Sequence, residues 1–267
     1  MRRIAWTLVL LSPVSGLEAG DTAFLPEVSV HLQAARYAPT ETAFKWDGWV
    51  GAGAGFVELD GVTLHGTAEV ETIIGNEKRA FDANQANYHL ETGLRKSIGS
   101  GGVGVFFHHV SRHYVDRPKI EAVDWNVLGV RAGAAFPASF PVAGRVTAQI
   151  GHTTLASLVG YRWEARVQTE ADLGARNAGG VYLLADARLV TREPSALFPE
   201  ERFVDLTVEA GGRWSRGART LRAFAAYERR NDVLLEAPGR KDRALLGLRV
   251  GFGESAAANA STSASSP

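Results

Sequence analysis

The sequence has no cysteine, which excludes disulfide bonds, thiol catalysis, cysteine metal sites and lipoprotein anchoring. Its 29 basic and 29 acidic side chains cancel, so the chain lacks the basic surplus that nucleic-acid binding requires. After residue 11 no apolar run approaches the roughly 20 residues of a membrane-spanning helix. No segment keeps a helical hydrophobic period. These absences leave strands as the main structural element and point away from a nucleic-acid partner.

The two ends of the sequence differ from the rest in composition. Two arginines precede the apolar run Ile4–Leu11, and small residues follow up to Gly20, which is the pattern of a secretory signal peptide. We predict this signal over residues 1–20; the alternative is a buried strand over residues 4–11. Residues 254–267 are rich in alanine and serine and predict a disordered tail. Residues 21–253 would then form the folded domain.

Between these ends, apolar and polar residues alternate with a period of two. The run V-D-L-T-V-E at residues 204–209 is one example, and residues 62–70, 161–168 and 243–252 repeat the pattern. Such a strand has one apolar and one polar face. Segments near the ~10 residues of a tilted membrane-crossing strand are centred near residues 30, 50, 67, 92, 107, 130, 147, 164, 186, 208, 225 and 248. The pattern predicts an all-β fold, a closed antiparallel transmembrane β-barrel of about 12 strands.

The connections between these segments are of two kinds. Tight turns are expected at residues 59–61, 100–102, 137–141 and 215–219. Long polar loops are expected at residues 75–87, 114–123, 191–201 and 230–241, although the seventh and eighth connections break the alternation. Short periplasmic turns and longer extracellular loops are typical of a barrel in the bacterial outer membrane.

A soluble β-barrel or sandwich would show the same alternation with its apolar face turned inward. Three features favour the membrane: charges on the polar faces, the exporting signal, and the run G-L-R-V-G-F at residues 247–252. That run resembles the C-terminal signature of outer-membrane barrels, except that a tail follows Phe252 here. We therefore predict the bacterial outer membrane, with a soluble periplasmic all-β binding protein as an alternative.

The polar faces predict what fills the barrel. Mixed charges favour a salt-bridged interior over a wide pore, because barrels of this size leave little room. The side chains expected in the lumen are Arg162, Glu164, Arg166, Asp186, Arg188, Asp205, Glu209, Arg213, Arg222 and Glu228. Five tryptophans are expected in the interfacial belts, although the second falls on a polar face: Trp46, Trp49, Trp125, Trp163 and Trp214.

One segment, G-V-G-V-F-F-H-H-V-S-R-H-Y-V-D at residues 102–116, changes from apolar to polar along its length. Residues 103, 105 and 107 would face lipid, and His109, Ser111 and His113 continue that face towards the outer rim. There the strand leaves hydrocarbon for the headgroup zone, where polar side chains are tolerated. His108 has the opposite parity and is expected to pack in the lumen.

The next strand, over residues 124–136, returns from the outer side with Asp124 and Asn126 on the lipid-facing side. If the loop closes between residues 114 and 123, Ser111 lies opposite Asn126, and His113 lies opposite Asp124. A histidine, a serine and an amide or carboxylate would then gather on one external patch.

These groups are those of an activated serine. We predict Ser111 as the nucleophile, His109 as its base and Asn126 as the group that orients the imidazole. Asp124 or His113 could take the last role instead. The competing interpretation is an ordinary interfacial girdle, in which histidine and serine are common.

The sequence gives weaker support for a metal site than for an activated serine. The three histidines of the segment do not form a zinc site, because they point to different faces or lie two pleats apart. Asp116 and Glu121, with Asp124 nearby, are candidates for binding calcium, although acids near a loop are usually only solvated.

H-V-S at residues 109–111 and W-N at residues 125–126 resemble the motifs of outer-membrane phospholipase A. In that family His-x-Ser lies on one strand and Asn, preceded by Trp, on the next. The resemblance implies a twelve-stranded barrel with its active site on the lipid-facing outer rim. It departs at Arg112-His113, where the family has Asn-Gly, and its calcium-binding loop is not recognisable. Lipid A deacylase barrels also use His-x-Ser, with a glutamate as third member. The run H-V-S-R-H-Y-V-D also looks like a stretch of uncharacterised outer-membrane barrels.

The sequence thus predicts an outer-membrane barrel, monomeric or homodimeric, that hydrolyses acyl esters of membrane lipids at its outer rim. The competing hypothesis is a non-catalytic barrel, either a scaffold or a narrow channel.

Overall fold

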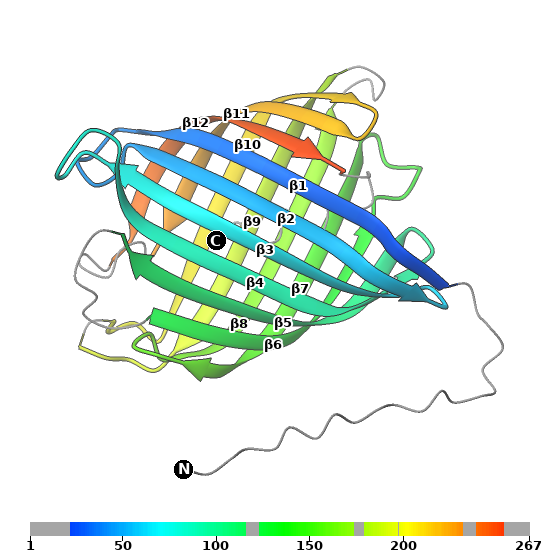
Figure 1. Cartoon of the computed structure of the whole chain (residues 1–267), viewed down its shortest axis with the longest axis horizontal. Helices are drawn as coiled ribbons and strands as arrows, with labels where there is room; N and C mark the ends of the chain where they lie inside the picture. Colours follow the sequence, from blue (N-terminus) through cyan, green and yellow to red (C-terminus); the bar gives the residue numbers. More distant parts are fainter. Residues whose placement is uncertain (1–21, 116–122, 174–178, 197, 232–238, 254–267) are drawn as a thin grey trace, which may run out of the picture.

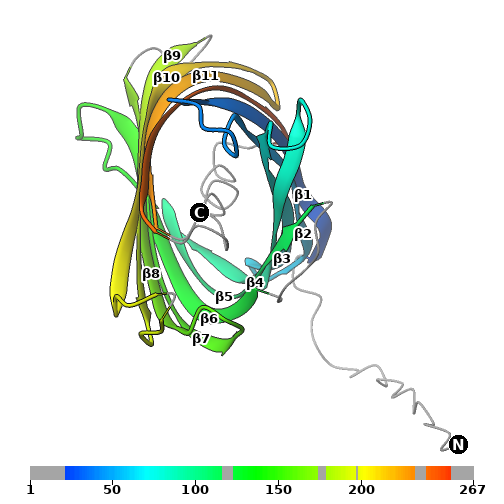
Figure 2. The ribbon, with the colours of Figure 1, turned by 90° about the vertical axis from the view of Figure 1, so that its left-hand side faces the viewer.

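The computed structural model describes residues 22–115, 123–173, 179–196, 198–231 and 239–253, which form a closed antiparallel barrel. Each strand pairs with its neighbours in sequence, and β1 pairs with β12 to close the ring (Figures 1 and 2). The strands are β1 (Thr22–Ala38), β2 (Trp46–Leu59), β3 (Val62–Gly75), β4 (Asp82–Ile98), β5 (Gly101–Tyr114), β6 (Val123–Ala135), β7 (Ala143–Ala156), β8 (Tyr161–Leu173), β9 (Gly180–Arg192), β10 (Arg202–Arg216), β11 (Arg219–Arg230) and β12 (Lys241–Phe252).

The predicted fold is confirmed: all-β, closed, with strands at the predicted places. Closure removes the open edge whose backbone groups would have no partner in hydrocarbon. Among the described residues, no helix is long and apolar enough to cross a membrane. The predicted signal over residues 1–20 and the predicted tail over residues 254–267 lie outside the described residues.

The two ends of the barrel differ in their connections. Short turns follow β2, β4 and β10, and the start of β1 and the end of β12 lie at the same end as these turns. The longer connections after β1, β3 and β9 lie at the other end, on the left of Figure 1, where β5 and β11 also end. Two connections break this contrast: the one after β6 is long, and the one after β7 is short. By the usual topology of such barrels, the first end is periplasmic and the second is the outer rim.

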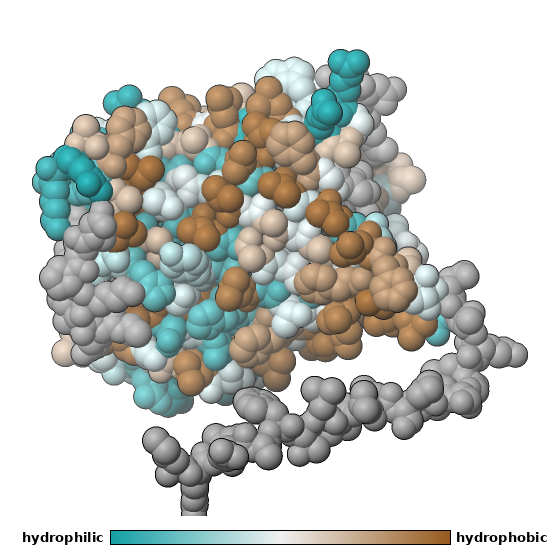
Figure 3. All heavy atoms as spheres, viewed as in Figure 1, coloured by the Kyte–Doolittle hydropathy of each residue, from teal (hydrophilic) through white to brown (hydrophobic). Residues whose placement is uncertain are grey.

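The outer wall of the barrel is apolar. Val50, Leu128 and Leu246 point outward and are 57%, 56% and 63% exposed. Figure 3 shows hydrophobic residues over much of this wall, with hydrophilic residues at its left end and scattered among them. A soluble protein would bury this surface, because water makes its exposure costly. The alternative of a soluble periplasmic binding protein is therefore wrong, and the barrel spans a membrane.

The lumen is filled by buried ion pairs. Arg188 donates to Glu164 at 2.7 Å and to Asp205 at 3.1 Å. Arg166 donates to Asp186 through Nε at 2.8 Å. The remaining lumenal pairs include Arg131–Glu91, Arg213–Glu170, Arg222–Glu170, Arg230–Glu71 and Arg249–Glu209. These pairs explain how a barrel this size keeps charged side chains inside, since a buried charge without a partner is very costly.

The start of β8 departs from the predicted alternation. The register with β9 shifts between Tyr161 and Trp163, so one extra residue enters β8 there. As a result Tyr161 turns inward and is 4% exposed, although the alternation predicted an outward ring. Arg162, predicted in the lumen, is exposed and pairs with Glu193 on the outside. A bulge of this kind reverses the faces of the residues before it.

Two of the five tryptophans predicted in the interfacial belts are in the lumen. Trp125 is 2% exposed and packs against the ring of Tyr161, with centroids 5.1 Å apart. Trp49 is also buried and donates its indole N–H to Asp47 at 2.9 Å. Trp163 and Trp214, each 49% exposed, lie on the outer wall as predicted.

Candidate active site at the outer rim

A strip of polar side chains lies on the outer wall of β5, next to the outer rim. Along the outward face of β5, Val105 and Phe107 are 48% and 39% exposed. The next residues on the same face are His109, Ser111 and His113, which are half-buried. The change from apolar to polar therefore falls at the end of the strand that carries the long loop, as the sequence predicted.

Apolar packing in the lumen lies directly behind this strip. The apolar inward residues of β5 and β6 towards the outer rim belong to one buried cluster. Arg112 contacts this cluster at Trp125, and its guanidinium lies 5.1 Å from the indole centroid. The cluster contains Phe106, Val110, Val123, Trp125, Val127, Val159, Tyr161, Val190, Phe198 and Phe203. Tight packing of this kind holds the two strands, and so the spacing of their outward side chains, in one arrangement.

His109 and Asn126 form the shortest polar contact of the strip. They face each other across β5 and β6, and His109 Nδ1 lies 2.6 Å from Asn126 Oδ1. An amide oxygen only accepts hydrogen bonds, so the imidazole must donate from Nδ1. In the neutral imidazole the other ring nitrogen, Nε2, then carries the lone pair and can take up a proton. This tautomer is the one that a general base next to a serine needs.

Ser111 makes its hydrogen bond with the histidine on its other side. His113 Nε2 lies 3.2 Å from Ser111 Oγ. The ring of His113 also packs edge-on against Tyr88 of β4, with centroids 5.3 Å apart. The described residues show no hydrogen bond between His109 and Ser111, although both lie on one face, with alpha carbons roughly 6–7 Å apart. The serine thus lies between two imidazoles, and its hydroxyl points to His113.

The predicted register between β5 and β6 is wrong by two residues. His109, and not Ser111, lies opposite Asn126, and Ser111 lies opposite Asp124. A shift of two residues leaves every side chain on the same face of the sheet, so the apolar alternation fits both registers equally. Asp124 Oδ1 is buried and has no hydrogen-bond partner among the described residues.

Tyr88 belongs to the site but was not among the residues predicted from the sequence. Tyr88 lies opposite Ser111 on β4 and is 41% exposed on the outer wall. Its outward parity could have been read from the alternation of Tyr88 with Leu90 and Leu94. The packing of its ring against His113 depends on side-chain rotamers and could not be read from the alternation.

His108 shows the opposite environment, as its parity predicted. It points into the lumen and stacks on His89, with ring centroids 5.6 Å apart and planes 22° apart. It therefore belongs to the interior packing and lies on the other side of the wall from Ser111.

The described residues contain no group of three or more histidine and acidic side chains placed to hold a metal ion. Asp116 and Glu121, the predicted calcium ligands, lie outside the described residues. Asp124 lies opposite Ser111 on β6. A single carboxylate does not supply the six to eight oxygen ligands of calcium.

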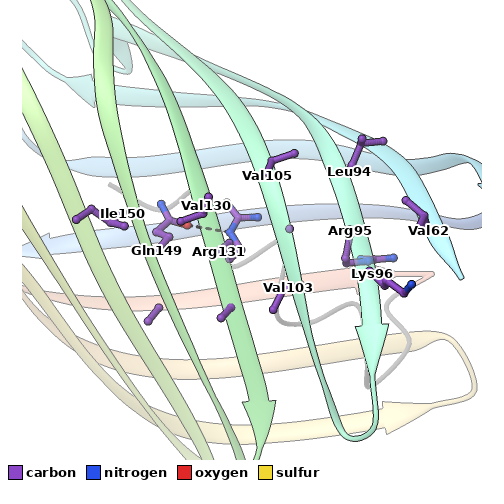
Figure 4. Close-up of a pocket in the computed structure, with 13 residues that line it drawn as sticks. Val62, Leu94, Arg95, Lys96, Val103, Val105, Val130, Arg131, Gln149 and Ile150 are labelled. Atoms are coloured by element: carbon purple, nitrogen blue, oxygen red, sulfur yellow. Dashed lines mark hydrogen bonds between the residues drawn. The ribbon is translucent and has the colours of Figure 1, made fainter.

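The same strands carry an apolar hollow further down the outer wall (Figure 4). It has a volume of about 670 Å³, and Figure 4 shows Leu94, Val105, Val130 and Ile150 around it. The small residues that line it are Gly104, Ala132 and Ala148. Val105 lies six residues from Ser111 on β5, which is roughly 20 Å along the strand. The hollow therefore lies well below the polar strip, in the half of the wall that is nearer the turn between β4 and β5.

No protein-family model and no curated protein matches the chain in sequence. Among solved structures, outer membrane phospholipase A from Escherichia coli is similar with a TM-score of 0.54 at 10% identity, covering 86% of this chain and 98% of that chain. The Salmonella typhi outer membrane phospholipase dimer with bound calcium has a TM-score of 0.51 at 11% identity, covering 86% of this chain and 92% of that chain. At these identities the likeness concerns the fold. Together with the closed ring and the apolar wall, it identifies a β-barrel of the bacterial outer membrane, similar in fold to outer membrane phospholipase A.

Proposed function

We propose that the protein is a serine-dependent hydrolase of acyl esters in membrane lipids, acting at the outer rim of the barrel. The observation that carries this proposal is the 2.6 Å contact between His109 Nδ1 and Asn126 Oδ1, two residues from an outward serine. A histidine that only lines the membrane interface does not need an acceptor that fixes its tautomer beside a serine. His152, for example, also lies on the outer wall but packs edge-on against Trp163, with centroids 4.9 Å apart.

The proposed reaction uses Ser111 as nucleophile and His109 as base. The hydroxyl of Ser111 rotates about χ1 from His113 towards His109, a change between ordinary staggered rotamers. His109 Nε2 takes the hydroxyl proton while Oγ attacks the ester carbonyl carbon. The proton then passes from His109 to the departing alcohol oxygen, which leaves an acyl-serine. Water, deprotonated by His109, attacks this second ester and releases the fatty acid and the free serine.

The lipid environment favours this substrate class. Ser111 opens onto the outer wall near the rim, where the ester bonds of membrane lipids lie. A lipid whose ester reached Ser111 would lay its acyl chain down β5 and β6, over Phe107 and Leu128, towards the hollow of Figure 4. Contact with these apolar side chains would position the ester without removing the chain from the membrane.

The Salmonella typhi phospholipase structure is a dimer with bound calcium. For this chain the described residues do not supply a calcium site, and every step above uses its own side chains. Assays with and without calcium, and at several protein concentrations, would show whether this protein also uses a cation or a second copy.

Fatty-acid release from phospholipid by the detergent-solubilised barrel tests the proposal. We expect activity in the parent protein, its loss in Ser111→Ala, and parent-like activity in His152→Ala, an outward histidine outside the site. Heat-modifiable gel migration of all three would show that the barrel is folded. Equal rates for the parent and Ser111→Ala would contradict the proposal.

The competing function, a non-catalytic barrel, would follow from that outcome. The ion-paired lumen would then favour a scaffold over a channel, because the Arg166–Asp186 and Arg188–Glu164 pairs occupy the interior.

A further inference from the structure

The periplasmic half of the barrel contains a cavity that is separate from the candidate site at the outer rim. It has a volume of about 410 Å³ and is lined by residues of β3 to β7, by the turn between β4 and β5, and by the carboxylate-bearing Glu27 of β1. Three arginines line it: Arg95, Arg131 and Arg145. Ser97, Ser100 and Thr147 add hydroxyl groups to its wall. Since residues of the β4–β5 turn form one side, the cavity lies near the periplasmic mouth.

Two of these arginines already have partners. Arg95 pairs with Glu27, and Arg131 donates to both oxygens of Glu91, at 2.9 and 2.6 Å. Arg131 also donates from Nε to Gln149 at 2.9 Å, and Figure 4 shows this bond. Their charges are therefore largely balanced, and their positions are fixed by the fold.

Arg145 is different. Its side chain points into the lumen from β7, and its Nε is buried without a hydrogen-bond partner in the described part of the chain. Glu170 lies directly opposite it on β8, but that carboxylate is bonded to Arg213 at 2.6 Å and to Arg222 at 3.0 Å. No carboxylate of the described residues pairs with Arg145. Arg145 therefore lacks the acidic partner that Arg95 and Arg131 each have.

The wall next to Arg145 leaves space at the guanidinium. A Cβ added at Gly133 would lie 3.3 Å from Arg145 Nη2 and 3.1 Å from Thr147 Oγ1. The glycine therefore keeps open the approach to a cation and a hydroxyl that lie side by side. A guanidinium presents paired N–H donors that match the oxygens of a phosphate or carboxylate.

We propose that this cavity binds a small oxyanion, such as a phosphate group, that enters from the periplasmic side. Arg145 supplies the unmatched positive charge and a two-pronged hydrogen bond. Thr147 adds a hydroxyl donor, and Arg95 and Arg131 add positive potential around the site. The bound anion balances the charge of Arg145, as Glu27 does for Arg95 and Glu91 does for Arg131.

Isothermal titration of the full-length, detergent-solubilised barrel with inorganic phosphate tests this inference, with chloride at matched ionic strength as the blank. We expect saturable phosphate binding that weakens by about tenfold or more in Arg145→Gln, since a hydrogen bond to a charged group is lost. Arg145→Lys, which keeps the charge but not the planar fork, should fall between the two. Arg219→Gln, an exposed arginine at the same end of the barrel, should bind like the parent.

A parallel titration with glycerol 3-phosphate distinguishes free phosphate from the phosphate of a lipid headgroup. Tighter binding of inorganic phosphate would indicate the free ion, and tighter binding of glycerol 3-phosphate would indicate a headgroup. The inference is overturned if phosphate gives no more heat than chloride, or if Arg145→Gln and Arg145→Lys both bind like the parent. Neither result bears on the proposed hydrolase activity. Fatty-acid release is a separate assay, and it depends on Ser111 at the outer rim.

Discussion

His108 and His109 are adjacent in sequence but lie on opposite sides of the barrel wall. His108 stacks on His89 in a lumen crowded with arginines and carboxylates. His109 faces the lipid side and bonds to one neutral amide, Asn126. Inside, most charged groups are paired with opposite charges, with Arg145 as the exception among the cavity-lining arginines, and this pairing offsets the cost of burying them. Outside, neutral groups capable of proton transfer meet without compensating charges. The difference separates polar side chains that hold the barrel together from those placed to react.

The largest effect on the rate of fatty-acid release is expected for His109, the histidine on the outer wall. His109→Ala removes the general base, and such groups contribute about a hundredfold to ten-thousandfold to rate. We expect fatty-acid release to fall by that factor while heat-modifiable migration stays unchanged. His108→Ala should leave the rate near that of the parent. If His113→Ala abolishes activity and His109→Ala does not, the base has been assigned to the wrong imidazole.

The lumen should respond in stability. Arg188→Met leaves Glu164 and Asp205 buried without their shared partner, which costs about 3–5 kcal/mol. Arg162→Met, which breaks an exposed pair with Glu193, should cost about 0–1 kcal/mol. Urea unfolding of the two variants in lipid vesicles measures both. A loss of stability as large for Arg162→Met as for Arg188→Met would remove the distinction between the inside and the outside of the wall.

A smaller effect is expected at the orienting amide. Asn126→Ala removes the acceptor that fixes the His109 tautomer, and we expect kcat to fall about tenfold to a hundredfold. Because the substrate does not contact this amide in the proposed reaction, KM should hardly change. A rise in KM at constant kcat would instead make Asn126 a lipid-binding residue.

The smallest effect is predicted in the apolar hollow. Ala132→Leu would fill part of it, and chain-length selection in apolar pockets is worth about 1–3 kcal/mol per methylene at most. We expect a shift towards shorter acyl chains of a few-fold in relative kcat/KM, measured with a series of phospholipids. An unchanged series would show that the acyl chain does not reach this part of the wall.

Much of this arrangement could be predicted from the sequence because strand alternation is a local property. The faces of Val105, Phe107, His109 and Ser111 follow from their spacing alone. The filled lumen also follows, since mixed charges on the inward faces require partners.

What could not be predicted depends on relations between strands. The register that places His109 opposite Asn126 differs by two residues from the predicted one, and both satisfy the same pattern. The extra residue at the start of β8 turned Tyr161 and Arg162 over, and nothing in the local sequence marked it. The bond from Ser111 to His113 depends on side-chain rotamers, which the pattern of apolar residues does not fix.

In the proposed reaction Ser111 is an activated nucleophile on the lipid-facing wall. Reaction of the folded barrel with a fluorophosphonate, followed by peptide mass spectrometry, tests it most directly. We expect one adduct, on the peptide that contains Ser111, and labelling that slows by about a hundredfold or more in His109→Ala. Absence of any adduct, or labelling of Ser111 at the same rate without His109, would contradict it.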